Sequence, residues 1–190
     1  MRKIFLILGF ICGFIQASLG EIDRFYTKKD GLAGTYFHDI LQDSKGYMWI
    51  CTKSGLNRFD GYNFEEYQFD SADSTSLNSS TAITVFEDSE KRIWVGTNRG
   101  LNLYDPKKDC FKRIKLAFNN TSMIVSVKAI LQVSPNQLYL ITSNGLVRFN
   151  CNTGEQSFFN LRYETNGIPS YTQFNDGLID PNGNIWIVTS

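Results

Sequence analysis

The strongest constraint on this chain is a sequence repeat with a constant step of 45 residues. Trp49, Trp94 and Tyr139 occupy the same place in three successive copies, and the glycines at positions 55, 100 and 145 keep the same step. A fourth copy begins at Asp180 and carries Trp186 at the aromatic position. A period of this length indicates an array of similar structural units.

Each copy alternates apolar and polar residues and is rich in β-branched and aromatic side chains, a pattern typical of β-strands. Glycine or asparagine lies in the short links, where a tight hairpin requires a positive φ. We therefore expect four antiparallel strands in each unit. In the first unit they are predicted at residues 36–42, 47–52, 56–60 and 64–69.

A single four-stranded meander of this size exposes both of its faces and is not stable alone. Packing such sheets face to face around an axis buries these faces, and four strands in ~40 to 50 residues are typical of a propeller blade. The predicted fold class is all-β: β-propeller blades, each a four-stranded antiparallel meander, in an incomplete arc of three blades plus the start of a fourth. Blades are expected at about 36–70, 81–118 and 127–163, with a truncated blade at 173–190.

The aromatic residue of each copy is expected to wedge between neighbouring blades. Asp43, Asp88 and Asp180 lie in the preceding hairpin turns, where a carboxylate accepts hydrogen bonds from turn amides. The third copy has Val133 instead, so its turn is expected to be less well tied. Residues 22–26 resemble the outer strands, and in a closed propeller such a strand completes the last blade.

Residues 1–20 have the pattern of an export signal. Arg2 and Lys3 precede an apolar run at residues 4–15, and small residues stand at positions 18 and 20. The run is shorter than the ~20 residues that cross a bilayer. We expect cleavage after Gly20, which leaves residues 21–190 as an exported domain.

Cysteine usage and charge exclude several classes of site. Four cysteines without a CxxC pair, together with one histidine, give no zinc or histidine-rich metal site. After cleavage, Cys51 is expected to be a buried apolar residue, whereas Cys110 and Cys151 can pair only if their Cα atoms lie within about 7 Å. The 19 basic and 19 acidic residues cancel, which gives no argument for nucleic-acid binding.

The first copy resembles a known family. Residues 30–64 include the run DSKGYMWICTKSGLNRFDGYNF and look like the first blade of the two-component regulator propeller family. The resemblance extends over residues 22–190. It is most specific in the first copy and weakest in the third, where the aspartate is lost and Tyr139 replaces tryptophan.

This resemblance implies the periplasmic sensor region of a hybrid two-component system histidine kinase, anchored in the inner membrane. Relatives carry two seven-bladed propellers, a β-sandwich, a membrane helix, and kinase, receiver and DNA-binding modules. The chain is then expected to be an N-terminal fragment, either an excised piece or a truncated gene product, and kinase activity to reside in modules outside it. The partners implied are the remaining blades and kinase modules, and a homodimer in the full-length protein.

Two local patterns suggest chemistry, and each also has a structural explanation. His38 lies on the predicted innermost strand of the first blade, where it either faces a ligand channel or is a structural residue. Asp180, Asn182 and Asn184 have the spacing of oxygen ligands in a calcium loop, but the bidentate carboxylate expected further on is lacking, and the other copies have a plain hairpin turn there. We therefore predict no catalytic, cofactor or metal site.

A carbohydrate site in a propeller is expected in the loops that enter the innermost strands. These loops are predicted at residues 27–35, 71–80, 119–126 and 164–171. The ligand-binding residues stay unknown, because nothing in the sequence ranks the chemically suitable side chains, Tyr36, Arg99, Asn120 and Tyr171. Asn78, Asn119 and Asn120 open N-x-Ser/Thr patterns, and Lys107, Lys108, Lys112 and Arg113 are expected to be solvated outer-edge charges.

Our functional hypothesis is that the chain belongs to a periplasmic propeller that recognises a carbohydrate. The expected ligand is an oligosaccharide, and the propeller is not catalytic. One alternative is an exported propeller enzyme that acts on a polysaccharide, as a lyase or glycoside hydrolase. The other is a protein-interaction scaffold. No cofactor is expected under the first hypothesis.

Overall fold

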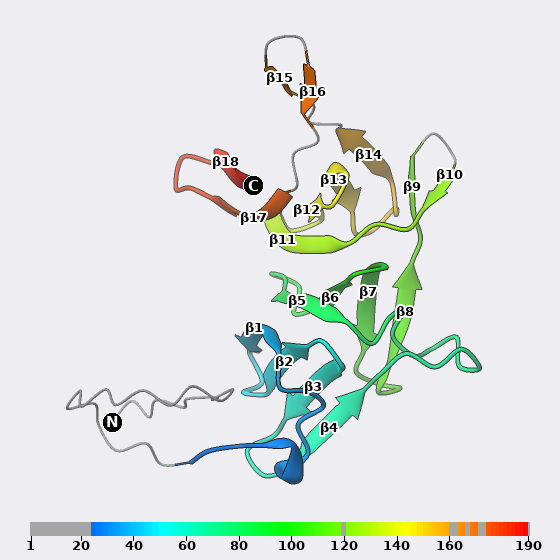
Figure 1. Ribbon diagram of the computed structural model, residues 1–190, viewed down its shortest axis with the longest axis vertical. Coiled ribbons are helices and arrows are strands. Elements are labelled where there is room, and N and C mark those ends of the chain that lie inside the picture. The colour runs from blue at the N-terminus through cyan, green and yellow to red at the C-terminus, as the bar shows by residue number, and fades with distance from the viewer. Residues whose placement is uncertain (1–23, 119–120, 160–162, 166–167, 171–173, 190) are drawn as a thin grey trace, which may run out of the picture.

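The computed structural model describes residues 24–118, 121–159, 163–165, 168–170 and 174–189 (Figure 1). The predicted signal peptide lies outside these residues, so it stays a prediction. Among the described residues, no helix is long and apolar enough to cross a membrane.

Three four-stranded antiparallel sheets follow one another along the chain, each with its strands in sequence order. The first contains β1 (Phe37–Gln42), β2 (Met48–Thr52), β3 (Gly55–Phe59) and β4 (Phe64–Tyr67). The second contains β5 (Ala82–Glu87), β6 (Ile93–Thr97), β7 (Gly100–Asp105) and β8 (Cys110–Ile114), and the third β11 (Val127–Ser134), β12 (Gln137–Thr142), β13 (Gly145–Asn150) and β14 (Gln156–Phe159). The hairpin of β17 (Phe174–Ile179) and β18 (Ile185–Thr189) begins a fourth sheet.

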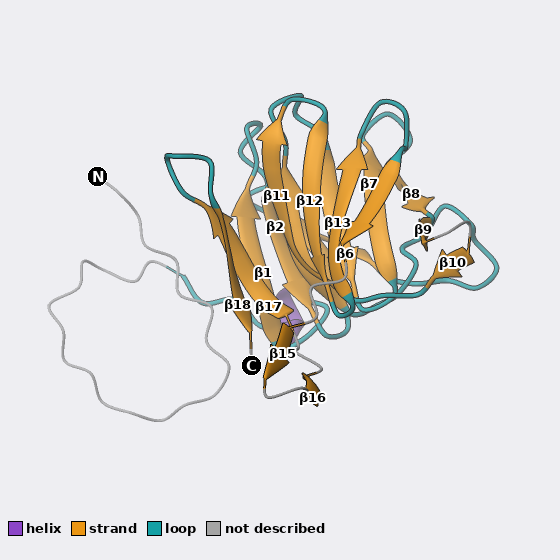
Figure 2. Cartoon of the chain, turned by 90° about the horizontal axis from the view of Figure 1, so that it is seen from above, coloured by secondary structure: helices purple, strands orange, loops and turns teal. Residues whose placement is uncertain are grey.

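The sheets lie side by side, one after another, in an open arc (Figure 2). The first strand of each sheet contacts the first strand of the next: β1 lies on β5, β5 on β11, and β11 on β17. This is the arrangement of propeller blades around an axis. The predicted fold class, with three blades and the start of a fourth, is therefore confirmed.

The connections contain elements that the repeat did not predict. The hairpins β9 (Leu116–Phe118) with β10 (Thr121–Met123), and β15 (Tyr163–Thr165) with β16 (Ile168–Ser170), precede the third and fourth blades. The described residues contain one helix, the 3₁₀ turn η1 (Lys28–Asp30). The described part of the predicted outer strand, residues 24–26, pairs with no strand in this structure.

The aromatic position of the repeat forms the wedge between blades. Trp49 is 1% exposed and meets the ring of Tyr104 in the second blade, with centroids 4.9 Å apart. Trp94 is equally buried and meets Phe149 of the third blade at 5.7 Å. Trp186 of the last hairpin is 61% exposed.

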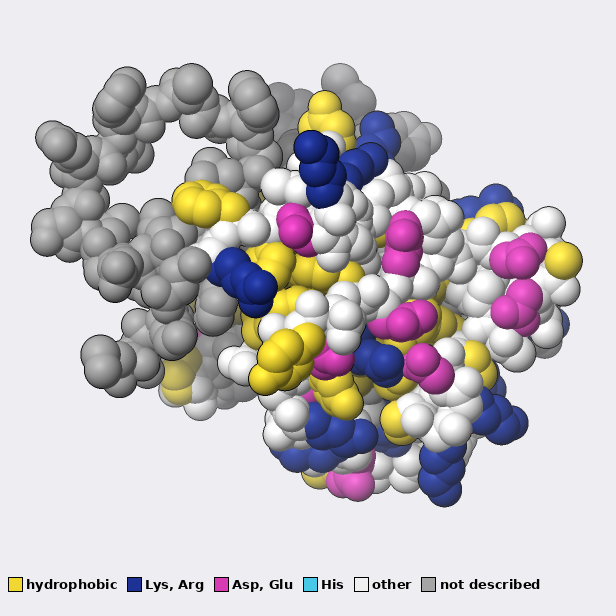
Figure 3. All heavy atoms as spheres, turned by 90° about the horizontal axis from the view of Figure 1, so that it is seen from below, with side chains coloured by type: hydrophobic (Ala, Val, Ile, Leu, Met, Phe, Trp, Pro, Cys, Tyr) yellow, Lys and Arg dark blue, Asp and Glu magenta, His cyan; other side chains and the backbone are white. Residues whose placement is uncertain are grey.

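The third wedge and the two ends of the arc complete this pattern. Tyr139 packs against a buried cluster that includes Phe174 of the fourth sheet, and Ile187 of that sheet packs against the same cluster. At the other end of the arc, hydrophobic side chains lie exposed among polar ones on the side of the first sheet (Figure 3), and Ile40 on β1 is 51% exposed. At the junctions between blades, in contrast, each buried aromatic ring removes roughly 150 to 250 Å² from water and so holds neighbouring blades together.

The turn aspartates act as predicted. Asp43 Oδ1 accepts hydrogen bonds from the amides of Lys45 and Tyr47, and its Oδ2 accepts one from Trp49 Nε1 at 2.9 Å. Asp88 and Asp180 repeat this pattern with Trp94 and Trp186, at 2.7 and 3.0 Å. Each carboxylate therefore ties a hairpin to its wedge. In the third blade Val133 is 39% exposed and has no carboxylate to do so.

Polar pairs also join successive blades at the same repeat position. The amide and hydroxyl of Ser44 donate to the two carboxylate oxygens of Glu87, at 2.8 and 2.6 Å. One blade later, Ser89 and Gln132 exchange two hydrogen bonds of 2.9 Å. Both pairs link the first turn of one blade to the end of the next blade's innermost strand.

Candidate functional site

The loops that enter the innermost strands are held by buried asparagines. Asn57 and Asn102 are fully buried, and each Oδ1 accepts a hydrogen bond from a loop amide, that of Ala33 at 2.8 Å and that of Asn78 at 3.0 Å. These loops and the β2–β3 and β6–β7 turns form what we call the connector face. The third blade has Val147 at the equivalent position, which supplies no such bond.

Only some of the residues that were considered suitable for binding a carbohydrate lie on the described part of the connector face. Tyr36 is 71% exposed, and the Lys53 ammonium lies 5.8 Å from its ring centroid. Arg99 is exposed, and no contact joins it to Tyr36 among the described residues. Asn119, Asn120 and Tyr171 lie outside the described residues. Asn78 is a structural residue here, because its side chain bonds Thr97 and Asn102.

The two other candidates from the sequence are His38, which is an isolated side chain, and the segment at Asp180, which is a hairpin turn. His38 is exposed on β1 and forms no hydrogen bond or ion pair with a described residue. Asp180 uses its oxygens to accept from the Asn182 and Asn184 amides, the Asn184 side chain and the Trp186 indole. These donors lower the pKa of Asp180 to about 2. In the described part of the chain, no group of three His, Cys, Asp or Glu residues is placed to hold a metal ion.

The described cysteines are unpaired. Cys51 is fully buried as predicted, and burial raises the pKa of its thiol. Cys110 and Cys151 are both free thiols in this structure, so the disulfide left open by the sequence is not formed here.

One of the predicted outer-edge charges proves to be an anchor. The guanidinium of Arg113 donates to the carbonyl oxygens of Asp70, Asp73 and Ser76, at 2.7 to 3.1 Å, and lies over the ring of Phe69. The expectation that Arg113 is simply solvated is therefore wrong. The link between the first two blades turns its carbonyls toward this side chain, and a guanidinium with five donors satisfies several of them at once.

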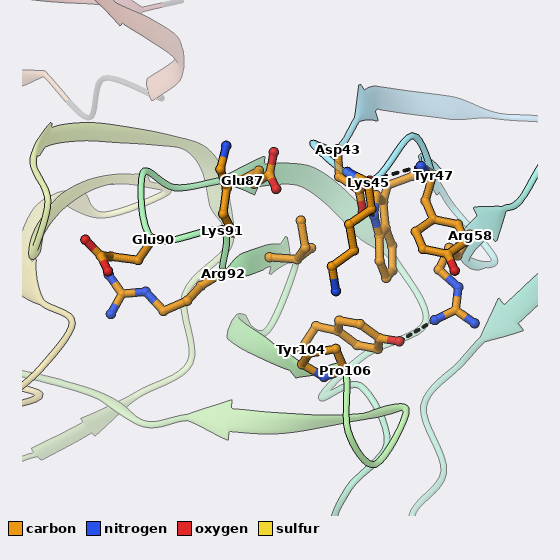
Figure 4. Close-up of a pocket in the computed structure, with 12 residues that line it drawn as sticks. Asp43, Lys45, Tyr47, Arg58, Glu87, Glu90, Lys91, Arg92, Tyr104 and Pro106 are labelled. Carbon is orange, nitrogen blue, oxygen red and sulfur yellow. Dashed lines mark hydrogen bonds between the residues drawn. The ribbon is translucent and has the colours of Figure 1, made fainter.

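At the other end of the strands, the structure contains a cavity that the sequence did not predict. A cavity of about 330 Å³ opens between the first and second blades at the ends of β1 and β5 (Figure 4). We call it the junction cleft. It is lined by Asp43, Lys45, Tyr47, Trp49, Arg58, Glu87, Glu90, Lys91, Arg92, Ile93, Tyr104 and Pro106.

An arginine surrounded by aromatic rings forms one wall of this cleft. The Arg58 guanidinium carbon lies 5.2 to 5.9 Å from the ring centroids of Tyr47, Trp49, Tyr67 and Tyr104. Its Nη1 donates to the Tyr104 hydroxyl and, at 2.9 Å, to Asp109 Oδ1. Cation–π contacts and hydrogen bonds of this kind restrict the orientation of the guanidinium group.

Asp109 completes this cluster from the turn between β7 and β8. Its Oδ1 also accepts from the hydroxyls of Tyr67, at 2.6 Å, and Tyr104, at 2.5 Å. Burial acts to raise the pKa of Asp109, but these hydrogen bonds and the charge of Arg58 outweigh it and lower the pKa. Burial and the bond to Asp109 raise the pKa of Tyr104 to about 12, so the phenol stays a donor.

No sequence pattern singled out Lys45, Arg58, Tyr104 or Asp109. Arg58 lies 46 residues from Tyr104 and 51 from Asp109, so no local motif joins them. The available signal was Tyr104, whose position carries Phe59 and Phe149 in the other two copies, because a phenylalanine has no hydroxyl for this network. Arg58 gave no such signal, since the third copy carries Arg148 at its position.

The comparisons with known proteins identify the repeats. Residues 31–54 and 76–99 match the family model described as two component regulator propeller. These segments run from each connector loop through β1 and β2, or β5 and β6, into the following turn. The chain thus carries two component regulator propeller repeats in its first two blades.

A curated relative and two solved structures agree with this match. The chain is 35% identical over 83 residues to histidine kinase P4 of Formosa agariphila, covering 41% of this chain and 6% of that protein. The extracellular domain of a putative hybrid two component system of B. thetaiotaomicron superimposes with a TM-score of 0.68, at 18% identity, over 82% of this chain and 20% of its own. A second such domain gives a TM-score of 0.53, at 19% identity, over 87% and 29%.

Propellers of another kind share the architecture. Virginiamycin B lyase from Staphylococcus aureus gives a TM-score of 0.56 at 16% identity, over 78% of this chain and 47% of the lyase. At such identities the likeness concerns the fold alone. This chain spans 6% of the curated relative and less than a third of the two extracellular domains.

Proposed function

We propose that this chain is part of the extracytoplasmic ligand-sensing propeller of a hybrid two-component regulator. Under this proposal it recognises a carbohydrate in the periplasm, carries out no catalysis itself, and acts with further blades and kinase modules. The observation that supports it best is the match of residues 31–54 and 76–99, in the first two blades, to the two component regulator propeller model. The likeness to a histidine kinase and to extracellular domains of such systems supports the same function.

The blade junctions give a physical route from binding to signalling. Successive blades are joined by side-chain pairs such as Ser44 with Glu87 and Ser89 with Gln132. A ligand that contacts two blades changes the relative stability of their arrangements. It shifts the sensor toward an active state only to the extent that it binds that state more tightly.

The test is calorimetric titration of the exported protein with di- to hexasaccharides from neutral and acidic polysaccharides. The same samples are assayed for new reducing ends and for unsaturated products. Saturable binding without turnover is the expected result. If no oligosaccharide binds, carbohydrate sensing is ruled out and a protein-interaction scaffold takes its place.

A propeller lyase is the second candidate, because a lyase shares the architecture. The sequence contains one histidine, His38, as a candidate imidazole base. Turnover of any oligosaccharide that is lost in His38→Gln, with binding retained, would establish the lyase in place of the sensor. Turnover unaffected by that substitution would place the chemistry on another residue.

A further inference from the structure

Several residues of the junction cleft depart from the repeat. The positions of Lys45 and Tyr47 in the first blade carry Glu90 and Arg92 in the second blade, and Pro135 and Gln137 in the third. On the opposite wall, the positions of Lys91 and Tyr104 carry Asn136 and Phe149 one copy later. Arg58, in contrast, recurs as Arg148 in the third copy. Since the shared turn aspartates and wedges build the fold, Lys45, Tyr47, Lys91 and Tyr104 are additions to what the fold requires.

A free ammonium group points into the cleft. The Lys45 side chain extends from the β1–β2 turn across the cavity toward Tyr104 and Pro106 (Figure 4). Its amine has no hydrogen bond or ion pair with any residue in the described ranges. Asp43, the nearest carboxylate in sequence, has its oxygens occupied by the turn amides and the Trp49 indole.

Arg58 adds a second, held cation to the same wall. One of its nitrogens, Nη1, donates to Tyr104 and Asp109, which leaves other guanidinium N–H groups without a partner among the described residues. The rings of Tyr47 and Tyr104 supply flat walls beside these charges. Of the acidic lining residues, Glu87 is held by two hydrogen bonds from Ser44 and Asp43 by its own hairpin, and neither forms an ion pair with Lys45 or Arg58.

From this arrangement we infer that the junction cleft binds a small organic anion, a carboxylate or sulfate carried on a ring with one apolar face. The anionic group lies between Lys45 and Arg58, and the ring packs on the tyrosine walls. A volume of about 330 Å³ is at the lower end for small-molecule pockets. The test uses a sugar as the ring because of the proposed function. The requirement for an anionic group rests on Lys45 and Arg58 and is independent of that function.

The test measures calorimetric binding of D-glucuronate, D-glucose 6-sulfate and neutral D-glucose to the exported protein and to Lys45→Met. We expect both anions to bind more tightly than glucose, and the tighter one identifies the source of the charge. Because a hydrogen bond to a charged group contributes about 1.5 to 3 kcal/mol, Lys45→Met is expected to weaken anion binding by about tenfold or more. Lys45 is exposed, so the variant is expected to fold.

Lys112→Met is the matched control, since it removes an exposed lysine of the second blade that lies outside the cleft. It is expected to bind the anions as the parent protein does. The inference is overturned if glucose binds as tightly as the anions, if neither anion binds up to about 10 mM, or if both variants behave alike. Binding of neutral oligosaccharides in the earlier titration would then still support the proposed function.

Discussion

The Asp43 carboxylate accepts a hydrogen bond from the Trp49 indole across one hairpin, with 2.9 Å between Oδ2 and Nε1. The indole is 1% exposed and the carboxylate 7%. A buried indole N–H without a partner is costly, so the aspartate allows the ring to be buried between blades. The same pair recurs as Asp88 with Trp94.

The first prediction concerns these pairs. Asp43→Ala removes the acceptor of two turn amides and of a buried indole, and is expected to lower the free energy of unfolding by about 1 to 3 kcal/mol. Asp180→Ala is expected to cost less, because Trp186 is 61% exposed and water replaces the carboxylate. Urea denaturation of the two variants measures both changes. Equal losses would contradict the role given to burial.

The second prediction concerns pH. The pKa of Asp109 is lowered in the folded chain, so its stabilising effect is fully present above the unfolded pKa of about 4. It is lost as the pH falls through the lowered folded pKa. The difference in unfolding free energy between the parent protein and Asp109→Asn is therefore expected to be constant near neutral pH and to shrink below about pH 4.

Other aspartates with lowered pKa values, Asp30, Asp60, Asp73 and Asp180, also weaken the fold in acid. Subtracting the two denaturation curves removes their contribution, because both proteins contain them. A difference that stays the same from neutral pH to about pH 2 would show that Asp109 is not held as a carboxylate by Arg58 and the tyrosines.

The third prediction concerns the link between the first two blades. Arg113→Met keeps much of the side-chain length but removes the donors to the carbonyls of Asp70, Asp73 and Ser76. Hydrogen exchange of amides at residues 70–77 is expected to accelerate, while that of β6 changes little. Lys112→Met, the exposed neighbour, is expected to leave both segments unchanged. Equal acceleration in the two variants would remove the anchoring role.

The fourth prediction concerns the tight packing at Gly96 on β6, which lies against Thr84 of its own blade and Val127 of the third blade. A Cβ added at Gly96 would lie 2.7 Å from Thr84 Cγ2 and 2.9 Å from Val127 Cγ1. Gly96→Ala is therefore expected to destabilise the chain by about 1 to 3 kcal/mol, as overpacking does.

Thr84→Ser offers a sharper test of the same contact, because it removes the methyl group but keeps the hydroxyl that donates to Asp39. In the double variant the cost of Gly96→Ala is expected to fall. A Gly96→Ala protein of unchanged stability, or strictly additive losses in the double variant, would show that the Thr84 methyl group does not limit the space at Gly96.

The sequence alone determined the four-stranded blades and the buried wedges Trp49 and Trp94. Strand alternation and turn chemistry are local, and the repeat shows each local pattern several times. Asp43 and Trp49 are six residues apart in one hairpin, so their contact follows once the hairpin is recognised. The less well tied turn at Val133 was predicted for the same reason.

Only the tertiary structure decided which partners are contacted by the side chains that the repeat does not explain. Whether Arg113 is solvated or anchors a link, and whether Arg58 meets Tyr104 and Asp109, depends on how one blade docks on the next. A period-two pattern places a side chain on one face of a sheet but not against a particular partner. The junction cleft exists because two blades bring together residues that no hairpin joins.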